Sequence, residues 1–370
     1  MASIEKSDTR KADEIYSDIL KQISVGTWSV GEQLPTERAF AEQFKVSRPT
    51  MSRVLNRLRD NGHIRRVVGA GTFLARRTPQ MAADKTAIGL FVPGLGRGEI
   101  FEPICASIAE LSPQHNVTLI WGGLPSSSIG SDEQLTQAAE RLIEQGIRGV
   151  FFQPIEREQG SLESSRRIAK LFSDAGVKLV LLDADYESFP KRSANDLVEI
   201  DNTAASYQLA EHYLDQGAER VDFVWRPYTA NTLQPRIRGY HEALIDAGIQ
   251  PDKIWMHEGD TRDAGFVSDL VEKGAKNIIC ANDETASQLM SSLEALGLSV
   301  PGDVRVAGFD DVKYAHMLRV PLTTVRQPCR SLAEVALKTM IDRIEMPLLP
   351  PMVVTLQAEL CIRQSSLLPK

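Results

Sequence analysis

The chain has few cysteines and no long apolar run. Its four cysteines (Cys105, Cys280, Cys329 and Cys361) lie far apart, and no CxxC pair occurs among the 370 residues. This pattern predicts free, buried thiols and a reducing compartment rather than a disulfide framework. No apolar stretch approaches the ~18 residues that cross a bilayer, and the first residues lack the apolar core of a secretion signal. We therefore expect a cytoplasmic protein with no membrane partner.

Sequence motifs for catalysis are also missing. The six histidines show no metal-ligand spacing, and no G-x-S-x-G elbow occurs. Gly94, Gly96 and Gly98 do not complete the spacing of a dinucleotide loop, and no GK[ST] follows them. Acidic residues end several apolar runs, but no nucleophile or metal cluster is paired with them. The sequence therefore predicts no enzyme activity, no catalytic residue, no cofactor and no metal site.

Charge is unevenly distributed along the chain. The net charge is −7, yet residues 1–80 hold 14 Lys and Arg against 9 Asp and Glu, about +5. The segment VSRPTMSRVLNRLRDNGHIRRVVGAGTFL, from Val46 to Leu74, carries six arginines and one acid. A basic end on an acidic body indicates a module that binds a polyanion, joined to a part with another task.

Residues 1–75 have the pattern of three helices and a hairpin. Residues 11–25 place isoleucines at helical spacing, a second helix can be capped by Thr36, and a third by Ser47. Two short β-branched and aromatic runs then flank Gly69-Ala70-Gly71, which is a hairpin signal. The prediction is an α+β winged helix-turn-helix.

The third predicted helix is the candidate for reading DNA. Residues at the start of such a helix meet base edges in the major groove, where an arginine can bond guanine at two atoms. Arg48 is the leading candidate for that contact, and Arg57 and Arg59, far down the helix, are expected to be solvated. The second helix and the wing should contact the backbone. The predicted DNA-binding residues are Arg38, Ser47, Arg48, Thr50, Ser52, Arg53, Gly69 and Gly71.

The stretch LPTERAFAEQFKVSRPTMSRVLNRLRDNGHIRRVVGAGTFL resembles the DNA-binding domain of the GntR family of bacterial repressors. The resemblance covers residues 11–75. It implies that the positions matching Arg38, Ser47, Arg48, Thr50, Ser52 and Gly69 touch DNA. Two departures change what can be expected. Pro49 removes a donor from the helix start, and Val68 and Ala70 make the wing tip less polar than is usual in the family.

The rest of the chain follows a different pattern. Residues 76–86 read as a linker, with a proline and no periodic apolar face. From residue 87 to 370, short apolar runs alternate with helical stretches, which predicts parallel sheets covered by helices on both faces. The length favours two α/β lobes with a cleft between them. We expect the chain to cross between the lobes near 200 and again near 310–350.

The ends of the predicted strands suit a polyhydroxylated ligand. Open α/β sheets bind ligands at the carboxyl ends of their strands, where Asp183, Asp283 and Asp310 are expected. Carboxylates and amides can each bond two neighbouring hydroxyls, and aromatic faces can cover the C–H side of a sugar ring.

Three stretches of this body, RIRGYHEAL, GAERVDFV and NIICANDETASQLMSSLEALGLSVPGDVRVAGFDDVKYAHMLRVPLTTVRQP, resemble the sugar-responsive domain of the LacI family, itself similar to periplasmic sugar-binding proteins. The resemblance implies that Arg236 and Asp283 bind the effector, with Asn282 beside them. GEIFEPICASI replaces the common Asn-Pro-Phe-Phe pattern of the first loop. The predicted effector-binding residues are Phe101, Glu102, Gln153, Asp183, Asp185, Tyr186, Trp225, Arg236, Asn282, Asp283 and Asp310.

A GntR-type reader joined to a LacI-type sensor is similar to the layout of the bacterial arabinose repressors, which makes arabinose one candidate sugar. The resemblances imply a homodimeric repressor that binds a palindromic operator in double-stranded DNA and is released by a small sugar bound between the lobes. Two alternatives stay open. The same architecture could answer a nucleoside, a purine or a corepressor. An enzyme fused to the DNA-binding domain, as in the aminotransferase-like GntR proteins, would instead need a pyridoxal phosphate lysine.

Overall fold

The computed structural model divides into two compact units, Met1–Lys85 and Thr86–Lys370, which are treated separately below. Residues 76–84 of the predicted linker and Gly69 of the predicted wing lie outside the described part of the chain. No helix in the described part is long and apolar enough to cross a membrane. The structure describes residues 12, 15–16, 18–20, 22–23, 27–28, 31–60, 62–67, 71–75, 85–93, 95, 100–123, 131–156 and 160–368.

The first unit is a winged helix-turn-helix, as the sequence predicted. Its described residues between 12 and 23 are helical, and Ile15, Ile19 and Ile23 are buried in the core of this unit. Strands β1 and β2 pair antiparallel to form the wing. The elements that follow the first helix are α2 (Glu37–Gln43), α3 (Arg48–Asp60), β1 (Ile64–Val67) and β2 (Gly71–Leu74).

Local sequence explains the angle between α2 and α3. The Thr36 hydroxyl caps α2 by accepting a hydrogen bond from the backbone N–H of Ala39. After α2 the chain turns at Lys45, whose φ of 52° lies in the left-handed region. Phe40 and Met51 are wholly buried, so the apolar faces of the two helices share one core.

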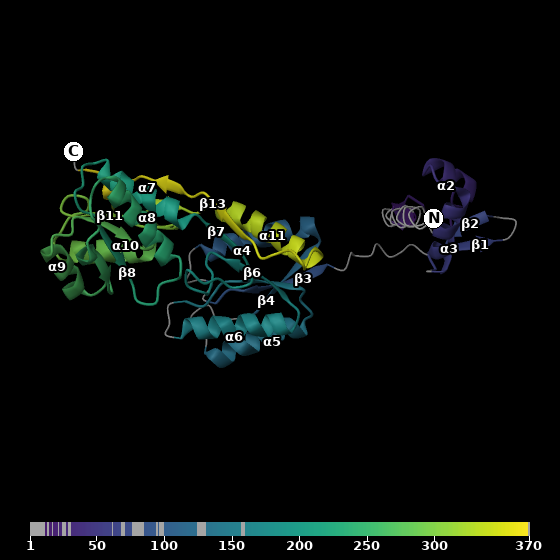
Figure 1. Cartoon of the computed structure of the whole chain (residues 1–370), viewed down its shortest axis with the longest axis horizontal. Coiled ribbons are helices and arrows are strands. Elements are labelled where there is room, and N and C mark those ends of the chain that lie inside the picture. The colour runs from purple at the N-terminus through teal and green to yellow at the C-terminus, as the bar shows by residue number, and fades with distance from the viewer. Residues whose placement is uncertain are drawn as a thin grey trace. The chain divides into compact units, whose positions relative to one another are not determined.

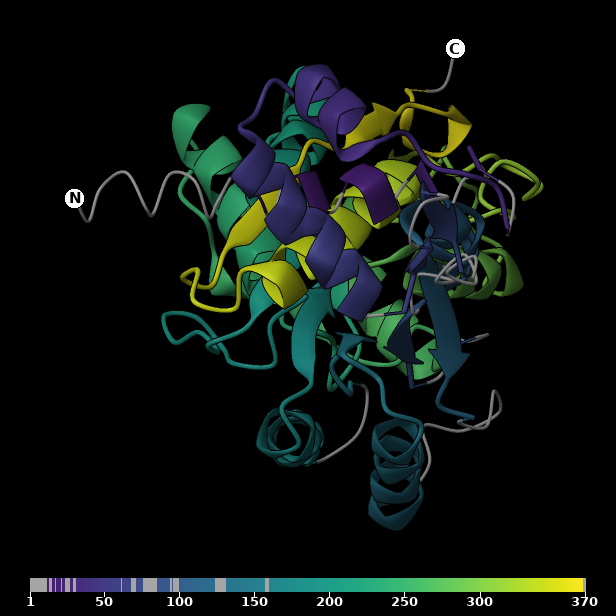
Figure 2. The same ribbon diagram turned by 90° about the vertical axis from the view of Figure 1, so that its right-hand side faces the viewer.

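The first lobe of the second unit is a six-stranded parallel sheet in the order β13-β7-β6-β5-β3-β4. Alternate residues of its strands face opposite cores, so Val180 and Leu182 pack with α4 and α11, and Leu179 and Leu181 pack with α5 and α6. Figures 1 and 2 show α5 and α6 side by side on one face and α11 on the other. Its elements are β3 (Thr86–Phe91), α4 (Phe101–Leu111), β4 (Val117–Trp121), α5 (Asp132–Glu144), β5 (Gly149–Phe152), α6 (Ser161–Asp174), β6 (Lys178–Leu182), β7 (Asp196–Ile200), α11 (Cys329–Glu345) and β13 (Val353–Leu356).

The second lobe is a four-stranded parallel sheet in the order β11-β10-β8-β9, with α7 and α8 on one face and α9 and α10 on the other. Two parallel sheets covered on both faces confirm the predicted fold class. Cys105 and Cys280 are buried and free, as expected. The elements of this lobe are α7 (Asn202–Leu214), β8 (Asp222–Trp225), α8 (Leu233–Asp246), β9 (Met256–Glu258), α9 (Ala264–Glu272), β10 (Asn277–Cys280), α10 (Asp283–Ala295), β11 (Arg305–Ala307), β12 (Thr324–Arg326) and β14 (Glu359–Cys361).

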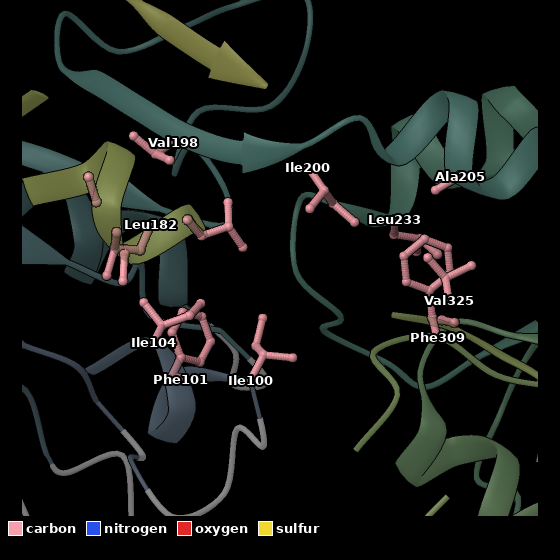
Figure 3. Packing of buried hydrophobic residues seen from close by; sticks show 14 of the residues in the cluster. Ile100, Phe101, Ile104, Leu182, Val198, Ile200, Ala205, Leu233, Phe309 and Val325 are labelled. Carbon is pink, nitrogen blue, oxygen red and sulfur yellow. The ribbon is translucent and has the colours of Figure 1, made fainter. Parts of the chain in front are cut away.

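The chain crosses between the lobes three times, one more than the sequence predicted. The first crossing follows β7 at residue 201, and the second lies between β12 and α11, at Gln327 and Pro328. The third lies between β13, which pairs with β7 in the first sheet, and β14, which pairs with β12 in the second lobe. Figure 3 shows buried apolar side chains approaching this region from both lobes, with Ile200 between Val198 and Leu233.

Candidate DNA-reading surface and ligand pocket

The start of α3 exposes the residues expected to read bases. Ser47, Arg48 and Arg53 are exposed, and Ser52 is half-buried. The Ser47 hydroxyl accepts from the backbone N–H of Thr50 at 3.3 Å and so caps the helix. Capping by Ser47 orients the first turn, from which the Arg48 side chain extends into solvent.

Thr50 has a different place from the one predicted. Its side chain is wholly buried, and its hydroxyl lies 2.7 Å from the Ser47 hydroxyl. A side chain with no exposed surface cannot touch a base edge. We therefore correct its role to that of a support for the Ser47 cap.

Two other arginines in this unit have partners in the protein. Arg38 Nε donates to Glu42 Oε1 at 2.9 Å on the exposed face of α2, so its expected DNA contact requires that exposed pair to yield. Arg57 was expected to be only solvated. Its guanidinium instead lies over the ring of Tyr16, 4.2 Å from the centroid, and joins α3 to the first helix.

Gly71 is explained by the fold of the wing. It opens β2 with a φ of 119°, which disfavours any residue with a side chain. A Cβ here would collide with the side chain of Gln33. The predicted contact between Gly71 and DNA therefore stays a prediction, and the structure supplies a separate reason for the glycine.

A pocket of about 280 Å³ lies where the two lobes meet. This is near the lower end of the ~300–1,000 Å³ usual for small-molecule sites. The first lobe contributes loops after β5 and β6, the start of α6 and Phe101, and the second lobe contributes the loop after β8. The predicted residues that line it are Phe101, Gln153, Asp183, Asp185 and Tyr186, and the lining residues that the sequence analysis missed include Glu156, Tyr228 and Asn231.

Backbone strain gathers at the same strand ends. Asp183 after β6, Tyr228 after β8, and Asp310 and Asp311 after β11 all have positive φ, between 50° and 116°. Such conformations are costly for residues with side chains and are found mainly where function holds them in place. Here they turn the chain sharply at the edge of each sheet that faces the other lobe.

Arg236 lies behind the pocket, and the pocket-lining residues do not include it. Its side chain is buried on α8, where Nε donates to Asn202 Oδ1 at 2.8 Å and Nη1 to the Ala281 carbonyl at 2.6 Å. It also pairs with Asp310 at 3.7 Å and stacks on Phe309. Through these contacts the guanidinium joins several elements of the second lobe and supplies a positive charge there.

Gln327, at the second crossing, joins carboxylates of both lobes. Its amide nitrogen donates to Asp310 Oδ1 at 2.8 Å, and its side chain lies close enough to Asp183 to lower the pKa of that carboxyl. Gln327 is buried and lies at the end of the LacI-like stretch that closes with VRQP, but it was not among the predicted effector-binding residues. Gln327 therefore lies at a connection between the lobes, beside Asp183 of the pocket lining.

Burial raises the pKa of two acids near the pocket. The pKa of Asp183 rises to about 6, mainly because burial disfavours the charged form. The positive charge of Arg236 limits that rise, and Glu156 adds to it. The pKa of Glu199 on β7 rises to about 7, again through burial first and then through repulsion from Asp183. The two carboxyls therefore titrate close to neutral pH.

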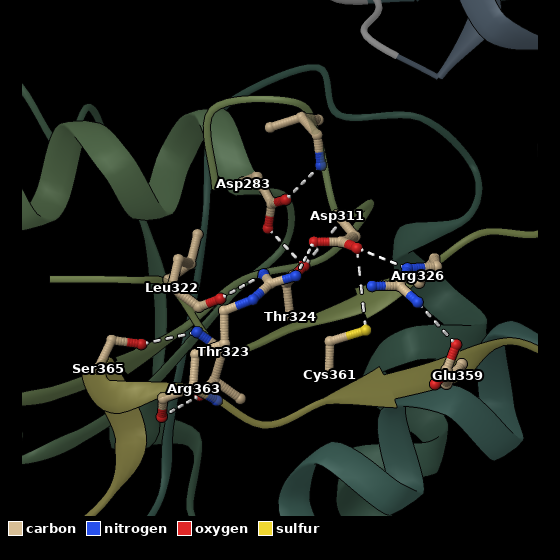
Figure 4. Close-up of polar contacts among 11 residues, drawn as sticks. Asp283, Asp311, Leu322, Thr323, Thr324, Arg326, Glu359, Cys361, Arg363 and Ser365 are labelled. Carbon is tan, nitrogen blue, oxygen red and sulfur yellow. Dashed lines mark hydrogen bonds and ion pairs between the residues drawn. The ribbon is translucent and has the colours of Figure 1, made fainter. Parts of the chain in front are cut away.

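Asp283 is structural, contrary to the prediction, whereas the half-buried Asn282 caps a helix and its predicted ligand contact stays a prediction. Asp283 is wholly buried, and its two oxygens accept from the Thr324 hydroxyl at 2.6 Å and from the Val312 N–H at 3.0 Å (Figure 4). The Asn282 side chain caps α10 by accepting from the Thr285 N–H. No surface of Asp283 is left for a ligand, so we correct its role to anchoring β12 and the loop after β11.

Two further predicted residues lie away from the pocket lining. Glu102 is exposed on α4, and Trp225 at the end of β8 is half-buried, with its ring 6.4 Å from that of Phe223. Neither side chain lines the pocket. Asn231, in contrast, could have been found by the strand-end rule that selected Asp183, because it lies in the loop that follows β8.

Comparison with known proteins matches part of each unit to a different family model. Residues 11–74 match the model for bacterial regulatory proteins of the gntR family, and residues 210–366 match that for a periplasmic binding protein-like domain. Relatives span nearly the whole chain. The arabinose metabolism transcriptional repressor of Geobacillus stearothermophilus is 25% identical, over 90% of each chain. The PurR repressor of Photobacterium profundum is 24% identical, over 94% of this chain and 97% of its own.

A solved structure, described as a complex of the transcriptional regulator CelR with cellobiose, superposes with a TM-score of 0.65. It is 20% identical and covers 90% of this chain and all of that one. At this identity the likeness shows the shared fold.

Proposed function

We propose that this chain, which joins a gntR-family regulatory domain to a periplasmic binding protein-like domain, is a transcriptional repressor that a small sugar releases from DNA. The relatives that span the chain are named as repressors, one of them of arabinose metabolism. The observation that carries the ligand half is the pocket between the lobes, lined by polar side chains and the aromatic Phe101, Tyr186 and Tyr228.

The DNA half is supported by the exposed arginines of α3 and by the match of residues 11–74 to the gntR-family model. Arg48 is placed to read a base edge, and Arg53 to hold a phosphate. We propose a homodimer that reads a palindromic operator, because paired winged helices read paired half-sites. The protein would act in the cytoplasm, without a cofactor and without catalysis.

Release would follow from a change in the angle between the lobes. A ligand that bridges Asp183 and Asn231 would hold the two lobes closed around the pocket. In the dimer, this closure would change the spacing between the two winged helix-turn-helix domains. A purine or nucleoside is the second candidate, because one full-length relative is named PurR. The aromatic side chains of the pocket could also stack on a base.

A ligand screen followed by a DNA-binding assay tests this proposal. Thermal unfolding of the full-length protein is measured with arabinose and other pentoses, with hexoses, and with purines and nucleosides. A duplex selected from a random library then serves as operator. We expect one sugar to raise the melting temperature and to weaken operator binding. Stabilisation by a purine alone would replace the sugar with the second candidate, and no effect of any ligand on operator binding would contradict the sensor role.

A further inference from the structure

The pocket presents hydrogen-bond acceptors that have no partner. Among the described residues, five buried side-chain atoms lack a hydrogen bond, and three of them gather here: Gln153 Oε1, Asp183 Oδ1 and Gln327 Oε1. Gln153 and Asp183 line the pocket, and Gln327 lies beside Asp183. Buried polar atoms are almost always paired, so a concentration of unpaired ones marks a place where a ligand supplies the partners.

The orientation of both glutamines is fixed by the acids beside them. The Gln153 amide nitrogen donates to Glu156 Oε1 at 3.0 Å, and the Gln327 amide nitrogen donates to Asp310 Oδ1 at 2.8 Å. Turning either amide would bring its oxygen against a carboxylate. The unpaired atoms of the two glutamines are therefore oxygens, which only accept hydrogen bonds.

The charge around the pocket has the same sign throughout its described lining. Four carboxylates line it, those of Glu156, Glu163, Asp183 and Asp185, and no lysine or arginine does within the described part of the chain. The two cations that act on these acids are themselves paired with carboxylates. Arg236 pairs with Asp310, and Arg192 lies 3.9 Å from Asp185. Within the described lining, a ligand would therefore meet carboxylates and no lysine or arginine.

A phosphate or a carboxylate group on the ligand suits neither the unpaired acceptor oxygens nor the charge of the pocket. It would place acceptors against acceptors and a negative charge beside buried carboxylates. Hydroxyl and ammonium groups, in contrast, donate to each of the unpaired oxygens. We propose that the pocket takes a polyhydroxylated ligand without negative charge, an unphosphorylated sugar or its amine, and rejects sugar phosphates and sugar acids. Asp183 sets this discrimination. This inference rests on the proposed sugar-sensing function and specifies its ligand class.

Matched ligand pairs test the inference on the full-length protein at pH 7.5. Calorimetry compares pentoses with their 5-phosphates, and hexoses with their 6-phosphates, uronic acids and 2-amino forms. We expect the neutral sugar or its amine to bind, and the anionic partner to bind on the order of 100-fold more weakly or not at all. A phosphate or acid that binds as tightly as its neutral partner overturns the inference and leaves the sensor function intact. If no member of any pair binds, the sugar-sensing function fails, and the inference fails with it.

A substitution of Asp183 assigns the discrimination to its carboxylate. Asp183→Asn keeps an acceptor oxygen and removes the charge. The affinity for the anionic ligand, relative to that for its neutral counterpart, should therefore rise by about tenfold or more. Asp174→Asn, at the exposed end of α6 where Asp174 pairs with Lys170, should leave the ratio unchanged. An unchanged ratio in folded Asp183→Asn would contradict the role of Asp183. The wild-type comparison of matched pairs tests the ligand class without any variant.

Discussion

At the scale of single residues, the two acids with raised pKa values make stability depend on pH. Glu199 and Asp183 are protonated in the folded protein up to about pH 7 and pH 6, whereas their ordinary pKa values are 4.5 and 3.8. Raised pKa values mean that the folded state holds protons that the unfolded state has lost. The stability they contribute is therefore fully present below about pH 4 and is lost as the pH rises through 6 and 7.

Glu199→Gln should remove part of this dependence. Between pH 4 and pH 8 the variant should gain about 3 kcal/mol in unfolding free energy relative to the wild type, because a neutral amide avoids the buried charge. Urea unfolding at several pH values measures the difference. Glu272→Gln, an exposed position on α9, is the control for losing one carboxyl. A Glu199→Gln curve parallel to that of the wild type would show that Glu199 does not titrate in this range.

Arg48→Ala should weaken binding to the selected operator by roughly 10- to 100-fold, because a bidentate guanine contact contributes about 1–3 kcal/mol. Sugar binding should persist, since Arg48 belongs to the other unit. Fluorescence anisotropy with operator and with scrambled DNA measures both the loss and its sequence dependence. Arg59→Ala, in the last turn of α3, is the matched control. If both substitutions lowered operator affinity equally, Arg48 would not be the residue that reads the base.

At the scale of elements, the motif RIRGY has two separable parts. Arg236 supplies the fixed charge behind the pocket, and Gly239 allows α7 and α8 to pack closely. A Cβ on Gly239 would meet the backbone carbonyl of Thr203, which cannot move aside as a flexible side chain could. The glycine is therefore required by helix packing, and the sequence alone could not separate this from a ligand role.

Gly239→Ala should lower the free energy of unfolding by about 3 kcal/mol, because α7 and α8 must move apart to accommodate the added methyl group. Denaturant unfolding measures the loss, and Glu242→Ala, exposed on the same helix, should change stability little. A Gly239→Ala protein as stable as the wild type would mean that the helices separate without cost.

The loop after β8 holds the lobes together across the pocket. Asn231 donates to the carbonyls of Asp185 and Tyr186 at 2.8 and 3.1 Å and accepts from the Ser188 hydroxyl at 3.2 Å. Asn231→Ala removes all three bonds, so bound sugar should dissociate about tenfold faster. Ser188→Ala removes one and should have a smaller effect. Stopped-flow dissociation measures both, and identical rates in wild type and Asn231→Ala would rule out this closure.

Sequence periodicity predicted most elements but missed those whose identity depends on long-range pairing. The short strands β13 and β14 exist because they pair with β7 and β12, which lie far away in the chain. Helix α4, residues 101–111, was not predicted either. At the site, strand-end position correctly brought Gln153, Asp183 and Tyr186 together, whereas Asp283 shares that position but points into the protein. Which way a strand-end side chain turns depends on its backbone, such as the left-handed φ of Asp183.

At the scale of the whole molecule, charge and chemistry are divided between two units. The basic winged helix has the means to bind DNA, and the acidic body has a pocket whose free atoms are acceptors. Such a division functions as a switch only if the two binding events are coupled. Coupling is reciprocal, so a sugar that weakens operator binding must itself bind more weakly to the operator complex, and by the same factor.

Calorimetry of the stabilising sugar against the free protein and against the protein saturated with operator tests this coupling most directly. The account predicts that operator weakens sugar binding by about 5- to 150-fold, and that sugar weakens operator binding by the same factor in anisotropy. Equal sugar affinities with and without operator would contradict it, because the pocket and the winged helix would then bind their ligands independently.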